Sequence, residues 1–345
     1  MSTLKVNTIN ASTSGQAVDV DIKNPKSFRN KVINGGMLVN QRGNQSSVTT
    51  SVYGLDRFKV QEAADVTYDI NQSTDTPDGF GNSFHIDIQG AQASPSASHF
   101  MQLMTALEGF DVQDFAKGTS GAKQYTVSFY VKTNVTGNYA LQITDDNSRS
   151  CSQLYTVSDT NWNRYTVTFP ADTTGAIDND NSEGLRLTWH LLVGTDRSSG
   201  TMNTTWAATT TANIAAGQNA NVASSTSNNW YITGVQLEVG SVATDFEHLS
   251  FADELRRCQR YFYKYDIGGI QMNLNRTGGR RTANVYFPTT MRDNGTVTIT
   301  TQFDDGGATI EADNIRTYGF IFKQASSSAS NDAPTVSVFE VSAEL

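Results

Sequence analysis

The chain has 345 residues and a formal net charge of −9 at pH 7. Charged residues make up 17% of it, against roughly 25% in ordinary soluble domains, so uncharged polar side chains must cover most of its surface. The 37% of apolar residues suffices for a core and excludes wholesale disorder, while the acidic balance and the lack of any long apolar run argue against nucleic-acid binding and membrane insertion.

The first segment, residues 1–34, carries short apolar positions in a polar background. Val18, Val20 and Ile22 alternate as in a strand, but the segment has too few apolar residues to form a core of its own. Two interpretations stay open: an extended arm that packs on a partner surface, or a frayed terminus.

Residues 35–249 consist of short segments with period-two alternation, separated by turn-forming residues. Strands are predicted at Tyr53–Val60, Thr67–Asn71, Ser83–Ile88, His99–Leu107, Tyr125–Val131, Tyr139–Thr144, Tyr165–Phe169, Leu185–Val193 and Trp230–Val239. In the last of these, Trp230 and Ile232 share one face but Leu237 falls on the other, which predicts a bulge at Thr233-Gly234. The stretch 201–229 reads as a long loop. This pattern predicts an antiparallel, jelly-roll-like sandwich.

Residues 250–265 break the alternation and predict one connecting helix. Ser250 and Asp253 have capping-box spacing, and Gly268-Gly269 ends the segment. The residues of the apolar stripe that we expect to be buried are Phe251, Leu255, Cys258 and Phe262. Residues 266–345 predict a smaller C-terminal β domain, so the fold class is all-β: a jelly-roll-like sandwich, one helix and a smaller β domain.

Motifs for catalysis and metal binding do not stand out. The two cysteines and four histidines are widely spaced, and no nucleophile elbow or phosphate-binding glycine loop occurs. The oxygen-rich turns Asp145-Asp146-Asn147 and 178–181 could hold calcium, but lack the pattern of the twelve-residue calcium loop, so plain turn chemistry is the preferred interpretation. We therefore expect no enzyme, no catalytic residue, no metal and no cofactor.

Aromatic residues at loops or strand ends are the candidates for binding a saccharide, because flat sugar faces stack on aromatic rings. These candidates are Trp162, Trp206, Tyr155 and Tyr53. Trp189 and Trp230 sit within strands and are expected in the core. For each candidate the alternative is ordinary core or turn packing.

Several segments resemble bacteriophage tail-fibre and host-attachment proteins. They are MSTLKVNTIN, VINGGMLVNQRGN, YTVSFYVKTNVTGNYALQI and, most distinctively, ITGVQLEVGSVATDFEHLSFADELRRCQRYFYKY. Residues 123–169 and 230–238 also resemble jelly-roll carbohydrate-binding modules. Those modules commonly have an Asp where this chain has Thr233-Gly234, so the resemblance carries no structural calcium over to it.

The resemblance implies a virion protein, made in the host cytoplasm, that mediates attachment to the host cell as a tail fibre or appendage. It implies three partners: further copies of the chain in a homotrimer, other tail or head proteins contacted through the arm, and a host surface glycan bound multivalently. A head decoration or tail adaptor without receptor contact is the alternative. A glycan-degrading tailspike is disfavoured, because it needs facing carboxylates and normally a regularly repeating β-helix.

Overall fold

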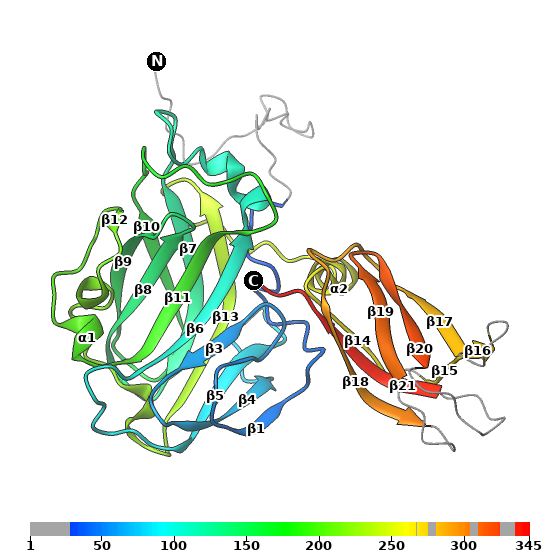
Figure 1. The fold of residues 1–345 in the computed structure, drawn as a ribbon. Helices are drawn as coiled ribbons and strands as arrows, with labels where there is room; N and C mark the ends of the chain where they lie inside the picture. The colour runs from blue at the N-terminus through cyan, green and yellow to red at the C-terminus, as the bar shows by residue number, and fades with distance from the viewer. Residues whose placement is uncertain (1–27, 267, 275–280, 304–309, 325–334) are drawn as a thin grey trace, which may run out of the picture.

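Two antiparallel sheets packed face to face form the larger part of the molecule in the computed structural model of the chain (Figure 1). The structure describes residues 28–266, 268–274, 281–303, 310–324 and 335–345. Of the arm predicted at residues 1–34, residues 1–27 lie outside the described ranges. No helix in these ranges is long and apolar enough to cross a membrane.

The six-stranded sheet has the order β1–β4–β5–β13–β7–β10. Its strands are β1 (Gln45–Val48), β4 (Thr67–Ser73), β5 (Ser83–Gly90), β13 (Asn229–Val239), β7 (Tyr125–Thr133) and β10 (Asn163–Phe169). The seven-stranded sheet has the order β12–β9–β8–β11–β6–β3–β2. Its strands are β12 (Ala207–Ala208), β9 (Arg149–Val157), β8 (Gly137–Asp145), β11 (Glu183–Val193), β6 (Phe100–Glu108), β3 (Lys59–Glu62) and β2 (Val52–Tyr53). The all-β prediction is confirmed.

The core lies between the two sheets, where alternate residues of each strand meet. Phe129 of β7 packs edge-on against Trp189 of β11, with ring centroids 5.6 Å apart, and Trp189 and Trp230 are both closed to solvent. Short helical turns connect the strands: η1 (Gly109–Phe115), α1 (Thr195–Ser198), η2 (Thr211–Asn213) and η3 (Val222–Ser224). The turns η2 and η3, together with β12, lie within the predicted long loop.

The predicted bulge in β13 is confirmed. The register between β13 and β7 shifts between Thr233 and Gln236, and Gly234 there has a positive φ of 62°. A Cβ on Gly234 would lie 2.7 Å from the ring of Phe80, so only glycine fits. The extra residue returns Leu237 to the core, where it is fully buried.

The prediction of a continuous strand at Tyr53–Val60 is wrong. The chain turns between β2 and β3, with the Gly54 N–H donating to the Phe58 carbonyl over 2.9 Å and Arg57 at a φ of 71°. Residues 55–57 are buried by this turn rather than by a strand.

The connecting helix, α2 (Phe251–Gln259), is shorter than predicted. Its cap is confirmed, because the Ser250 hydroxyl accepts a hydrogen bond from the Asp253 N–H over 3.2 Å. The helix ends before Phe262, which instead begins β14 (Phe262–Tyr265) and pairs with the last strand of the chain. Aromatic residues at consecutive positions favour that strand over a further helical turn.

Burial of the predicted apolar stripe is confirmed only in part. Cys258 is fully buried and Leu255 packs beside it on residues 33–39, and Phe262 is buried from its place in β14. Phe251, however, is 58% exposed, and its neighbours Ala252 and Asp253 are exposed as well.

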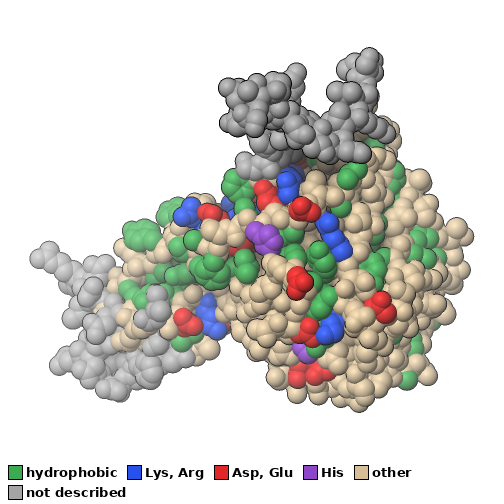
Figure 2. Space-filling model, turned by 180° about the vertical axis from the view of Figure 1, so that it is seen from behind, with side chains coloured by type: hydrophobic (Ala, Val, Ile, Leu, Met, Phe, Trp, Pro, Cys, Tyr) green, Lys and Arg blue, Asp and Glu red, His purple; other side chains and the backbone are tan. Residues whose placement is uncertain are grey.

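The smaller domain is built from two four-stranded antiparallel sheets. One contains β14, β21 (Thr335–Ser342), β15 (Ile270–Gln271) and β18 (Thr296–Phe303); the other contains β16 (Asn273–Leu274), β17 (Arg281–Tyr286), β20 (Gly319–Gln324) and β19 (Ile310–Arg316). Its core is aromatic, with Phe320 and Phe339 at 5.4 Å. Seen from behind, hydrophobic side chains gather on this domain, whereas the sandwich is mostly uncharged polar (Figure 2).

Candidate functional site

Of the four aromatic residues singled out from the sequence, Tyr155 lies in the core. It is 5% exposed, and its ring packs against those of Tyr139, Phe129 and Tyr165 at centroid distances of 5.4, 5.1 and 5.2 Å. Burial raises the pKa of its hydroxyl well above the ordinary value. The expectation that Tyr155 sits at a loop is corrected: it is an inward residue of β9, a strand that the sequence analysis missed.

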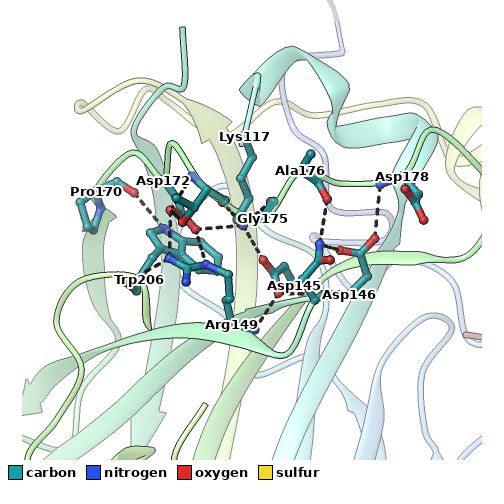
Figure 3. A network of polar contacts seen from close by, with 12 residues as sticks. Lys117, Asp145, Asp146, Arg149, Pro170, Asp172, Gly175, Ala176, Asp178 and Trp206 are labelled. Carbon is teal, nitrogen blue, oxygen red and sulfur yellow. Dashed lines mark hydrogen bonds and ion pairs between the residues drawn. The ribbon is translucent and has the colours of Figure 1, made fainter. Parts of the chain in front are cut away.

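Trp206 is also buried, with 9% of its surface exposed. Its indole N–H donates to the Pro170 carbonyl over 2.9 Å, and the Lys117 ammonium lies 4.5 Å from its ring centroid. Figure 3 shows the ring enclosed among these residues and Arg149. Trp206 therefore packs against a buried network of ion pairs and encloses it on one side.

That network surrounds Lys117, whose side chain is fully buried. The ammonium forms an ion pair with Asp145 and lies 3.0 Å from an oxygen of Asp172. It also donates to the carbonyls of Thr174 and Gly175, over 3.2 and 2.7 Å (Figure 3). The predicted oxygen-rich turn at Asp145 therefore directs a carboxylate to an internal ammonium, and no group of three or more possible metal ligands occurs among the described residues.

Tyr53 lies at the junction of the two domains. Its hydroxyl donates to the carbonyl of Leu345, and the guanidinium of Arg42 sits 5.1 Å from its ring centroid. Burial, followed by the nearby charge of Glu344, raises the pKa of Tyr53 to about 12. These contacts give Tyr53 a structural role between the domains.

Trp162 is the remaining candidate, and it lies at the outer face of the six-stranded sheet. It directly precedes β10, whose first residue, Asn163, pairs with Val131 of β7. Continuing the antiparallel register places Trp162 beside Lys132. Within β7, Lys132 lies between two buried residues, Val131 and Thr133, so its own side chain points outward.

The outer face carries a row of side chains at one level across five strands. The pairs Asn71 with His85, His85 with Tyr231, and Tyr231 with Lys132 stand directly opposite each other, and Trp162 completes the row at the β10 edge. We call these five residues the cross-strand row. His85, Tyr231 and Lys132 each lie between two buried neighbours, so the row faces solvent while the core lies beneath it.

Aromatic rings form the centre of the cross-strand row. The rings of His85 and Tyr231 are parallel within 1° and 4.1 Å apart, and Trp162 meets Tyr231 edge-on with centroids 6.1 Å apart. The His85 Nε2 lies 2.7 Å from the Asn229 side-chain oxygen, which fixes the imidazole orientation. The three rings are therefore held in place before any ligand arrives.

Asp75 links two neighbouring members of the row, Trp162 and Lys132. Its carboxylate accepts a hydrogen bond from the Trp162 indole N–H over 2.9 Å and one from the Lys132 ammonium over 2.6 Å. Partial burial raises the pKa of Asp75, but these hydrogen bonds outweigh it and the pKa lies below its ordinary value. Asp75 is therefore ionised near neutral pH and acts as a fixed acceptor.

A second aromatic group borders the row along the same face. Phe80 packs on Tyr130, Phe246 and His248 with centroid distances of 5.3, 5.1 and 5.2 Å. Tyr130 is the outward residue next to Lys132 on β7. This group covers the adjacent level of the sheet, beside the cross-strand row.

His85 and Tyr231 were missed in the sequence analysis. Each sits in a strand that was predicted correctly, and the alternation of Tyr231 with the buried Trp230 and Ile232 already assigns it to the outer face. What the alternation does not give is which outward residues of different strands share a level, because that depends on register.

Comparisons with known proteins find resemblance at the level of structure. No family model matches the chain, and no curated protein matches it in sequence. Similar solved structures include the bacteriophage CBA120 tailspike protein 4 enzymatically active domain, with 10% identity, a TM-score of 0.33, and coverage of 61% of this chain but 21% of that one.

Two carbohydrate-binding modules are also similar. TmCBM61, solved in complex with beta-1,4-galactotriose, has 10% identity and a TM-score of 0.31, with 61% of this chain and 99% of the module covered. The family 11 module from Clostridium thermocellum, solved with a beta-1,3-1,4-mixed-linked tetrasaccharide, has 11% identity and a TM-score of 0.28, with 60% and 98% covered.

Proposed function

We propose that the chain binds a saccharide across the six-stranded sheet, along the cross-strand row. The observation that carries this proposal is the fixed aromatic group of His85, Tyr231 and Trp162, which is partly exposed on the outer face of the sheet. Ring faces and edges provide the apolar surface that a pyranose ring stacks on. Asn71, Lys132 and Asp75 beside them provide donors and acceptors for hydroxyl groups.

The proposed activity is binding without catalysis. Hydrolysis of a glycosidic bond needs one carboxyl group that is protonated and a second that is ionised. At the row, Asp75 is held ionised by Lys132 and Trp162, so it serves neither as a general acid nor as a free nucleophile. A shallow platform of this kind gives weak affinity at each site.

We place this binding in a phage particle, on the sequence resemblance to tail-fibre and attachment proteins. In that setting a homotrimer would present three platforms to a repetitive cell surface, and linked weak sites gain avidity. The N-terminal arm, residues 1–34, would connect the chain to other virion proteins. Sedimentation of the purified chain at micromolar concentration tests the trimer, and a 37.5 kDa species alone would contradict it.

Adsorption to cells tests the binding function. Purified protein would be applied to cells of a strain that the particle infects, with Trp162→Ala and Tyr231→Ala compared at matched folding. Both variants should bind at least fivefold less, since each removes stacking surface worth about 1–3 kcal/mol. The control is Phe251→Ala, which removes an exposed aromatic ring from α2.

Two outcomes would overturn the proposal. Retention of full binding by both row variants would show that the row is not the binding surface. Failure of the intact oligomer to bind cells or their extracted glycans would favour a head decoration or adaptor role.

A further inference from the structure

The smaller domain carries a second exposed aromatic site that the proposed function does not use. Tyr286 and Tyr318 are 73% and 61% exposed, although most of the domain's aromatic residues form its core. They line a surface groove of about 300 Å³ together with Asn284, Asn314 and Arg316. This volume is at the lower end of the roughly 300–1,000 Å³ found for small-ligand sites, and suits one or two sugar rings.

Strand register explains why the groove exists. Gly319 of β20 stands opposite both Tyr286 of β17 and Arg316 of β19. Because neighbouring strands are about 4.8 Å apart, the two side chains rise about 10 Å from each other with no side chain between them. A Cβ on Gly319 would lie 2.2 Å from the Val285 carbonyl oxygen, so only glycine fits at this position. The floor of the groove therefore carries no side chain between Tyr286 and Arg316.

An irregularity in β19 brings the polar groups to the groove. The register between β19 and β20 shifts between Asp313 and Arg316, and Asn314 there has a positive φ of 50°. The shift sets Arg316, rather than Ile315, opposite Gly319. The neighbouring turn is anchored on both sides, since the Phe287 N–H donates to the Tyr318 carbonyl over 3.1 Å and the Met291 N–H to the Thr317 carbonyl over 2.7 Å.

The groove is positively charged in a chain with a net charge of −9. Arg316 is the one charged residue among those that line it. Its guanidinium donates to the adjacent Ile315 carbonyl over 2.9 Å and forms no ion pair with any residue that the structure describes. The nearest acidic residue along β19, Asp313, is engaged by Lys323 at 3.4 Å. Arg316 is itself exposed, so an anion can reach its guanidinium from solvent.

We propose that this groove is a second binding site, for a saccharide that carries an acidic group. Tyr286 and Tyr318 give the stacking surface, Asn284 and Asn314 bind hydroxyl groups, and Arg316 binds the acid by paired hydrogen bonds. The acid could be a carboxylate, as in uronic or sialic acids, or a phosphate. This site lies on a separate domain from the cross-strand row, so the two proposals stand or fall independently.

Calorimetric titration of the full chain tests this proposal, with acidic oligosaccharides as probes. The probes are oligogalacturonate, oligosialate and a phosphorylated oligosaccharide, each paired with its neutral counterpart. Arg316→Gln should weaken binding of at least one acidic probe fivefold or more and leave its neutral counterpart unchanged. Tyr286→Ala should weaken binding of both the acidic probe and its neutral counterpart. Raising the salt concentration should narrow the difference in affinity between the acidic probe and its neutral counterpart, because salt screens the charge of Arg316.

Matched controls separate this groove from other surfaces. Arg256→Gln removes an exposed arginine from α2, and Trp162→Ala alters the cross-strand row; neither should change binding of the acidic probe at the groove. The proposal is overturned if none of the acidic probes binds, or if Arg316→Gln binds them like the unsubstituted chain. It is also overturned if Tyr286→Ala instead abolishes self-association, since the groove would then be an interface between copies.

Discussion

Arg57 and Glu344, 287 positions apart in the sequence, form an ion pair that joins the two domains. Their side chains are 2% and 4% exposed. The Arg57 guanidinium also stacks on the ring of Tyr261, 3.4 Å from its centroid, and donates to the Ala106 carbonyl over 2.6 Å. The turn between β2 and β3 thus places the charge of Arg57 at the domain junction, where Glu344 pairs with it.

Removing one partner of this pair should destabilise the protein strongly. Glu344→Gln leaves the buried Arg57 charge uncompensated and should lower the free energy of unfolding by about 3–5 kcal/mol, measured by urea denaturation. The control Glu340→Gln removes an acid that pairs with Lys264 at a partly exposed site and should cost less than about 1 kcal/mol. Equal losses of unfolding free energy in the two variants would contradict a stabilising role for the Arg57–Glu344 ion pair at the domain junction.

The buried network around Lys117 gives a second stability prediction. Lys117→Met leaves Asp145 and Asp172 facing each other without the ammonium, and should cost about 3–5 kcal/mol. The side chain of the exposed Lys123 donates to the Asp114 carbonyl over 3.0 Å, so Lys123→Met should cost less than about 0.5 kcal/mol. If thermal unfolding shows no larger drop in melting temperature for Lys117→Met than for Lys123→Met, the buried network around Lys117 does not stabilise the fold as proposed.

His190 should make stability depend on pH. The side chain is fully buried, and burial followed by the charge of Arg197 lowers its pKa to about 3. Unfolding returns this pKa to about 6.5, so the unfolded chain binds a proton that the folded chain does not. Its contribution to stability is therefore complete above pH 6.5 and falls as the pH drops toward 3.

The measurement is urea unfolding at pH 7 and pH 4.5. His190→Gln should reduce the loss of stability between these two values by about 2 kcal/mol, and His248→Gln, at an exposed position, is the control for replacing a histidine outside the core. A loss of the same size in all three proteins would show that folding does not lower the pKa of His190.

Helix α2 gives a test of how it is seated. Leu255 packs with Cys258 on residues 33–39, so Leu255→Ala should cost about 1–3 kcal/mol. Phe251 is exposed, and Phe251→Ala should cost less than about 0.5 kcal/mol. Chemical denaturation of the two variants distinguishes this arrangement from one in which the whole predicted stripe is buried.

Alternation and turn residues were sufficient to predict most of the sandwich. The bulge at Gly234 followed from parity alone, since Trp230 and Leu237 had to face the same core. The end of α2 did not follow, because Phe262 continues the helical spacing and only its pairing with β21 assigns it to a strand. Long-range pairing of this kind leaves no local signal in the sequence.

The candidate site was harder to predict than the fold. The sequence does not indicate whether an aromatic residue near a predicted loop is buried or exposed. Tyr155 and Trp206 are buried, whereas Trp162 lies on the outer face of the sheet. The partners of Trp162 come from β5, β7 and β13, which register brings to one level. The network that encloses Trp206 likewise depends on Lys117, a residue with no distinguishing sequence context.

Tryptophan fluorescence during saccharide titration tests the central claim most directly. Trp189 and Trp230 are fully buried and Trp206 is 9% exposed, so a ligand on the cross-strand row should perturb Trp162. Oligosaccharides from the host surface should change the emission of the intact chain, and Trp162→Phe should lose this change while calorimetry still detects binding. An emission change that persists in Trp162→Phe would place the saccharide elsewhere and contradict the account.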